Sequence, residues 1–139
     1  MEILPPQAGK ELEVYFICDA KNIENKYVFI GTTNLPINTY LMIELINRKI
    51  KYRASSKTQV LDYGKFESEI FKYGSDISSN SIPDGDYEIE IIVPITSVQP
   101  DNVKVVFGQK GRNLVGTYVT CDDITGKTIK FQKMVKVSR

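Results

Sequence analysis

Hydrophobic and polar residues alternate with a period of two along most of this chain, as they do in half-buried β-strands. The stretches with this alternation, or with a short β-rich apolar run, are residues 11–19, 26–30, 40–46, 50–54, 58–61, 65–71, 86–93 and 128–137. Turn-forming residues separate them, and no long stretch has the 3.6-residue period of an amphipathic helix. The pattern predicts an all-β fold, an antiparallel β-sandwich of the immunoglobulin (Ig) or fibronectin type with about seven to eight strands.

Individual segments sharpen this prediction. Residues 40–54 indicate a hairpin that turns at Asn47 and Arg48, and Gly31 indicates a break after an inner strand at 26–30. Lys133 falls on the inward side of the last strand, as happens where a strand leaves the core. The residues that we expect to be buried lie on the apolar side of their strands and are Val14, Phe16, Leu41, Ile43, Ile89, Ile91, Ile129 and Phe131.

Residues 99–114 are the exception to strand periodicity. Val103, Val106 and Phe107 have a partly helical spacing, which Gly108 and Gly111 interrupt. We therefore expect a short helical turn near residues 100–107, followed by a loop.

Length and composition restrict the class of protein. With 139 residues the chain has the length of one domain, and we expect a lead-in at residues 1–10 and a single Ig-like β-sandwich at residues 11–139. No apolar run approaches the ~20 residues that cross a bilayer, so this segment should not insert into a membrane. The net charge of +1 offers no overall field to attract nucleic acid.

The chain contains no histidine. This excludes Ser-His and Cys-His nucleophile pairs and zinc sites with histidine ligands. We expect a protein that is not an enzyme and that needs no cofactor and no metal.

Several segments resemble a known kind of domain. They are GTTNLP at residues 31–36 with Leu41 after it, GKF at 64–66, PDGDYEIEI at 83–91, SVQPDNV at 97–103 and FGQKGRNLVG at 107–116. In this order they resemble a β-sandwich domain that recurs in uncharacterised secreted, lipoprotein-like and membrane-tethered proteins of Gram-positive bacteria. The resemblance covers residues 26–135 and implies an Ig-like extracytoplasmic module without assigned catalytic residues. Where that family has an Asp-Gly-Thr turn, this chain has Ile37-Asn38-Thr39.

A basic row is one candidate contact surface. It consists of Arg48, Lys49, Lys51 and Arg53, with Tyr52 between them. Such a mixture can bind oligonucleotides on a strand face, but lysines on a strand also discourage edge pairing as part of an ordinary solvated face. We expect the solvated face.

The sequence Gly-Gln-Lys-Gly at residues 108–111 is the second candidate. It resembles the loop with which KH domains clamp a nucleic-acid backbone, and Lys110 and Arg112 would then contact phosphates. A KH domain needs a helix directly after this loop, and residues 113–120 are too rich in β-branched residues for one. We expect the two glycines to serve the shape of the loop.

Carboxylate pairs occur at Glu67 with Glu69 and at Glu88 with Glu90, on the side of each strand that should face solvent. Acid–base catalysis by two carboxylates needs environments that shift their pKa values apart. Both pairs are therefore expected to be exposed and structural.

Calcium is a weak alternative. Asp76, Ser78 and Asn80 begin like an EF-hand loop, but Ser81 stands where that loop needs glycine. Looser sites built from Asp84 with Asp86, or Asp122 with Asp123, are the remaining options, although acidic pairs in turns are ordinarily turn formers.

Two cysteines allow one disulfide. Cys18 lies on an inward strand position near the start and Cys121 follows a predicted strand near the end. A bridge would join the two parts of one sandwich, and the alternative is two buried, reduced thiols.

Together these observations predict a monomeric, non-enzymatic, extracytoplasmic Ig-like module of a larger bacterial protein, which acts as a binding or spacer module for an unknown protein or surface ligand. The alternatives are a KH-like nucleic-acid-binding domain and a small proteinase-inhibitor-like sandwich that presents residues 75–81.

Overall fold

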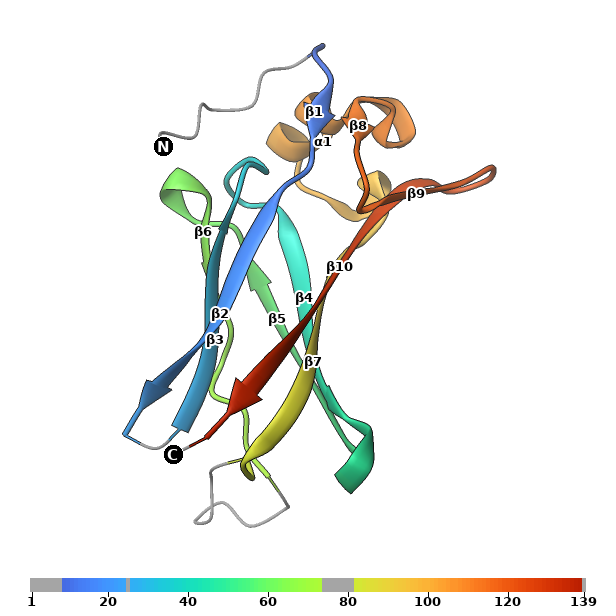
Figure 1. Cartoon of the computed structure of the whole chain (residues 1–139). Coiled ribbons are helices and arrows are strands. Elements are labelled where there is room, and N and C mark those ends of the chain that lie inside the picture. Colours follow the sequence, from blue (N-terminus) through green and yellow to red (C-terminus); the bar gives the residue numbers. More distant parts are fainter. Residues whose placement is uncertain (1–8, 25, 74–81, 139) are drawn as a thin grey trace.

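The computed structural model describes residues 9–24, 26–73 and 82–138. Two antiparallel sheets pack against each other (Figure 1). The three-stranded sheet has the order β2 (Phe16–Ile23), β3 (Lys26–Thr33), β6 (Lys65–Glu67), and the five-stranded sheet has the order β5 (Tyr52–Gln59), β4 (Tyr40–Asn47), β7 (Gly85–Val93), β10 (Gly126–Val137), β9 (Val119–Asp122). The all-β sandwich that the alternation predicted is confirmed.

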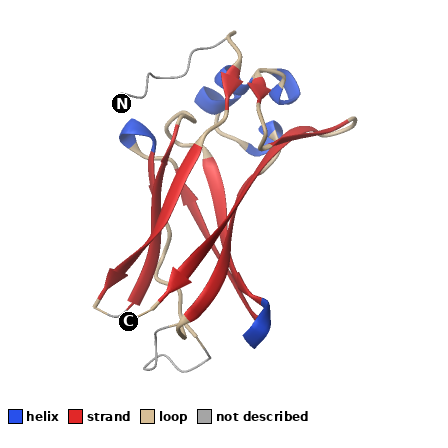
Figure 2. Ribbon diagram, in the orientation of Figure 1, coloured by secondary structure: helices blue, strands red, loops and turns tan. Residues whose placement is uncertain are grey.

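Short elements cap the ends of the sandwich (Figure 2). They are the parallel pair β1 (Leu12–Glu13) and β8 (Leu114–Val115), the helix α1 (Asp101–Phe107), and the 3₁₀ turns η1 (Arg48–Ile50), η2 (Asp62–Gly64), η3 (Thr96–Val98) and η4 (Gln109–Gly111). The short helix expected near residues 100–107 is confirmed, and its buried residues Val103 and Phe107 close one end of the core.

One hydrophobic core lies between the two sheets. All eight residues that the sequence placed in the core are buried, and Ile43, Ile89, Ile91 and Ile129 are 0% exposed. Phe16 on β2 contacts Phe131 on β10, with the ring centroids 5.5 Å apart, so aromatic packing joins the sheets directly.

Several strand boundaries differ from the sequence prediction. Gly31 lies inside β3, where a Cβ would collide with the carbonyl oxygen of Ile17, so the glycine permits a close approach of strands and not a break. Residues 58–61 are not a separate strand, because β5 runs without interruption through the serines that precede them. The first predicted strand is divided, since β1 ends at Glu13 and β2 begins at Phe16.

A β-bulge follows β6 and reverses the burial of the residues after it. Ile30 pairs with Glu67, whereas Tyr27 pairs with Phe71, so one extra residue lies on the β6 side. Phe71 is buried as a result, whereas Ile70, which stands two and four residues after the buried Ser68 and Phe66, is 40% exposed.

Candidate functional site

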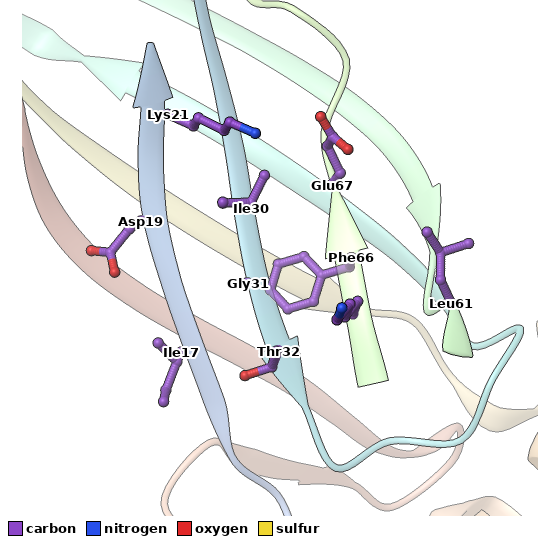
Figure 3. Close-up of a pocket in the computed structure, with 10 residues that line it drawn as sticks. Ile17, Asp19, Lys21, Ile30, Gly31, Thr32, Leu61, Phe66 and Glu67 are labelled. Carbon is purple, nitrogen blue, oxygen red and sulfur yellow. The ribbon is translucent and has the colours of Figure 1, made fainter. Parts of the chain in front are cut away.

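An open, largely apolar hollow of about 490 Å³ lies on the outer face of the three-stranded sheet, and we call it the β3 hollow (Figure 3). Phe16 and Cys18 of β2 face the core, so the residues that alternate with them face outward, into this hollow. The hollow is lined by Ile17, Asp19 and Lys21 of β2, Ile30, Gly31 and Thr32 of β3, Lys65, Phe66 and Glu67 of β6, and Leu61.

Apolar side chains in the β3 hollow remain in contact with solvent. Ile17 is 49% exposed and Leu61 is 56% exposed. Two acidic and two basic side chains surround them, so the rim carries no net charge. One of the acids, Asp19, lies 2.8 Å from the ammonium group of Lys133 on β10. A surface of this composition favours a protein partner over a polyanion.

Tyr63 lies on a tight turn between Leu61 and Lys65, which both line the hollow. Its φ of 62° lies in the left-handed region, and its side chain is 88% exposed. Gly64 follows with a φ of 73°, and a Cβ there would collide with the carbonyl oxygen of Thr33. Two consecutive left-handed residues form a tight turn of the type that, in hairpins, ordinarily carries Asn, Asp or Gly at the first position. An exposed tyrosine there costs conformational energy without gaining burial.

Sequence reasoning did not identify Leu61 or Tyr63. Their exposure depends on the turn between β5 and β6, whereas the sequence pattern assigned Leu61 to a separate strand at residues 58–61. The available signal was the dipeptide Tyr63-Gly64, because glycine after a turn residue marks a left-handed turn.

The basic row does not form one surface. Arg48 lies 2.9 Å from Glu88, and Arg53 lies 2.8 Å from Glu44, so both guanidinium groups are paired. Tyr52 points inward, where its hydroxyl donates to the carbonyl of Lys72 and its ring lies 6.0 Å from the ring of Tyr87. Burial, together with the nearby Tyr87, raises the pKa of Tyr52 to about 12. Tyr52 is therefore half-buried and takes part in the packing against the core.

Lys49 and Lys51 are both exposed in or next to η1. Lys110 and Arg112 are also exposed, but they lie at the opposite end of the sandwich (Figure 1). The two groups of basic residues do not converge on one ligand.

The glycine loop is packed into the fold. Gly108 and Gly111 have φ values of 78° and 74°, and a Cβ at Gly111 would lie within 3.2 Å of Thr96, Leu114 and Lys127. The chain continues from this loop into β8 and not into a helix. Both glycines therefore have the left-handed backbone that the shape of this loop requires, and the helix that a KH domain requires is absent from residues 112–118.

The carboxylates of β7 differ from the expectation. Glu90 is 5% exposed even though it lies on the outer side of the sheet. Desolvation raises its pKa, but the hydrogen bond from Gln132 and the charges of Lys130 and Arg53 outweigh that effect, so the net pKa lies below its ordinary value. Glu90 stays ionised near neutral pH and is held by these partners.

The other carboxylates fit a structural reading. Glu67 and Glu69 are exposed, and the bulge lies next to them. Asp122 accepts hydrogen bonds from the backbone N–H groups of Ile124 and Thr125, which lower its pKa and hold the β9–β10 turn. Asp122 therefore acts as a turn former.

No group of three His, Cys, Asp or Glu side chains within the described ranges could hold a metal ion. Asp84 and Asp86 flank the start of β7. The EF-hand-like residues Asp76, Ser78 and Asn80, and the proposed inhibitor loop 75–81, lie outside the described residues.

The two cysteines are both free thiols, so the possible bridge between them is not formed. Cys121 pairs with Lys127, whereas Lys133 donates to the carbonyl of Cys18, and these two positions on β10 are roughly 20 Å apart at ~3.3 Å per residue. A disulfide needs Cα atoms within ~7 Å. Cys121 is exposed, so the alternative of two buried thiols is also wrong.

No helix in the described part of the chain is long and apolar enough to cross a membrane. Comparison of the chain with protein-family models, with curated proteins and with solved structures found no match. The resemblance to the Gram-positive β-sandwich domain accordingly stays a prediction, and the argument for function rests on the site itself.

Proposed function

We propose that this chain is a non-enzymatic, Ig-like binding module of a larger extracytoplasmic bacterial protein and that it binds a protein partner through the β3 hollow. The observation that carries this proposal is the exposed Tyr63 in left-handed backbone beside the exposed Leu61. Tyrosine supplies a large contact area at low entropic cost and is enriched among the residues that dominate binding energy.

The chemistry of the surroundings supports a protein as the ligand. Tyr63 is 88% exposed, so a partner with a concave surface is needed to bury it. The rim of the β3 hollow carries two acidic side chains, Asp19 and Glu67, and two lysines, Lys21 and Lys65, which suits a partner that carries both signs of charge.

A photo-crosslinking experiment tests this function. The photoreactive residue p-benzoylphenylalanine is placed at position 63 of the full-length parent protein, which is expressed in its native cells. The control carries it at Val105, a residue of α1 that is 61% exposed. We expect a cross-linked protein only from position 63. Leu61→Asp should abolish that product, and in the purified pair it should raise the Kd at least tenfold.

Equal cross-linking from positions 63 and 105, or a product that survives Leu61→Asp, would reject the β3 hollow as the binding site. The extracytoplasmic part of the proposal has a separate test in the parent gene. We expect it to encode a signal peptide, a lipobox or a membrane-spanning helix. A parent protein shown by fractionation to lie in the cytoplasm would contradict this part alone.

A further inference from the structure

The outer face of the five-stranded sheet carries a second apolar site, on the other side of the molecule from the β3 hollow. The strand register places Lys57, Met42, Ile92 and Lys130 in one row across β5, β4, β7 and β10. Met42 and Ile92 are half-buried at the centre of this row. They form the floor of what we call the Met42 groove.

The Met42 groove has a volume of about 260 Å³. Tyr40 and Pro94 extend its apolar lining, and Tyr40 is 43% exposed. Pockets for whole small-molecule ligands usually span about 300–1,000 Å³. The groove is smaller than this and suits one apolar side chain of a larger partner.

The acidic side chains next to the Met42 groove are already paired, whereas one lysine is not paired within the described residues. Glu44 and Glu90 lie in the adjacent row, but Arg53 holds Glu44 at 2.8 Å, and Gln132 and Lys130 hold Glu90 at 2.8 Å and 3.7 Å. Lys57 lines the groove and is exposed, and it forms no ion pair with any residue in the described part of the chain. The groove therefore presents an apolar floor with one available positive charge.

We propose that the Met42 groove binds an acidic protein segment in which an apolar side chain stands next to a carboxylate. The apolar side chain occupies the floor between Tyr40, Met42 and Ile92, and the carboxylate pairs with the ammonium group of Lys57. Since Glu44 and Glu90 are already neutralised, they do not repel such a segment. A basic segment would gain no partner here and would meet the charge of Lys57.

This site is independent of the proposed function, because it uses different strands and the opposite sheet. Together the two surfaces would let the module hold two partners at once, one on each sheet.

Titration of the isotope-labelled protein with short peptides, followed by amide NMR spectra, tests the proposal. The probe is acetyl-Phe-Glu-Glu-amide, and the charge-reversed control is acetyl-Phe-Lys-Lys-amide. We expect saturable shifts at Met42, Thr58 and Ile92 with the acidic peptide and weaker binding of the basic one. The matched variants are Lys57→Glu in the groove and Lys49→Glu in η1, which make the same charge change at opposite ends of the sandwich.

Lys57→Glu should raise the Kd of the acidic peptide about two- to fivefold, the range of a single exposed ion pair. Lys49→Glu should leave that Kd unchanged. The same spectra report whether each variant is folded. Equal binding of both peptides, equal effects of the two substitutions, or shifts confined to residues outside the groove would overturn the proposal. None of these outcomes bears on Tyr63 or the β3 hollow.

Discussion

At the scale of single residues, burial separates the chemistry of the two cysteines. Burial raises the pKa of the Cys18 thiol to about 12, so almost no thiolate is present at neutral pH, whereas Cys121 is exposed. We expect iodoacetamide to modify one cysteine in the native protein and two in denaturant, measured by intact mass. Cys121→Ser should remove all modification of the native protein. If neither cysteine were alkylated in denaturant without a reducing agent, the assignment of two free thiols would be wrong.

The left-handed backbone at Tyr63 leads to a second prediction at this scale, about stability. Left-handed backbone costs a non-glycine residue about 1–2 kcal/mol, and asparagine tolerates it better. Tyr63→Asn should therefore raise the free energy of unfolding by about 0.5–1 kcal/mol, measured by urea denaturation, while it abolishes binding at the β3 hollow. Tyr40→Asn, on an exposed position of extended backbone, should give no such gain. A less stable Tyr63→Asn protein would mean that the side chain serves folding.

At the scale of elements, variants in the glycine loop at residues 108–111 distinguish a structural role of this loop from nucleic-acid binding. A Cβ at Gly108 would lie 2.7 Å from the Asn113 side chain in left-handed backbone. We expect Gly108→Ala to lower the free energy of unfolding by about 1 kcal/mol or more, measured by thermal melts. Replacement of the exposed Lys110 and Arg112 by alanine should leave stability unchanged.

The same variants test the KH alternative. Fluorescence anisotropy at low salt should detect no saturable binding of single-stranded RNA, because the basic residues lie at opposite ends of the sandwich. Micromolar binding that is lost when Lys110 and Arg112 are replaced would refute a purely structural loop.

The central strand β7 should be the most sensitive element to truncation. It pairs with both β4 and β10, and Ile89 is 0% exposed at its middle. Ile89→Ala should cost about 2–5 kcal/mol in the free energy of unfolding, determined with urea. Ile124→Ala, at a site 82% exposed in the β9–β10 turn, should change it by less than about 0.5 kcal/mol. Similar costs at both positions would argue against the assigned core.

At the scale of the whole molecule, stability should fall in acid. The folded pKa of Glu90 lies below its ordinary value of 4.5 after desolvation is outweighed by Gln132, Lys130 and Arg53. The stabilisation that the ionised Glu90 adds to the folded state is therefore complete above the pKa that Glu90 has in the unfolded chain. It is lost as the pH falls through the lower pKa of the folded state. The urea midpoint should decrease below about pH 5, and Glu90→Gln should flatten that decrease. An unchanged pH dependence in Glu90→Gln would assign the effect to other carboxylates.

The burial alternation was sufficient to predict the core because period two is a local property of each strand. Val14, Phe16 and Ile89 could be placed without knowing which strands pair. The bulge after β6 shows the limit of that argument, since one unpaired residue exchanged the positions of Ile70 and Phe71. Residues 67–71 contain no glycine or proline to mark the bulge.

The sequence by itself determined the all-β class, the inward residues of the main strands and the short helix before Gly108, because these follow from contacts between near neighbours. Only the tertiary structure decided that Glu90 is covered, that Tyr52 turns inward and that Cys18 and Cys121 lie far apart. It also decided that Leu61 lines the β3 hollow and that Tyr63 is exposed on the turn that follows it. Each of these facts depends on which strands become neighbours, and that choice is made by packing across the whole core and not by the residues of any one strand.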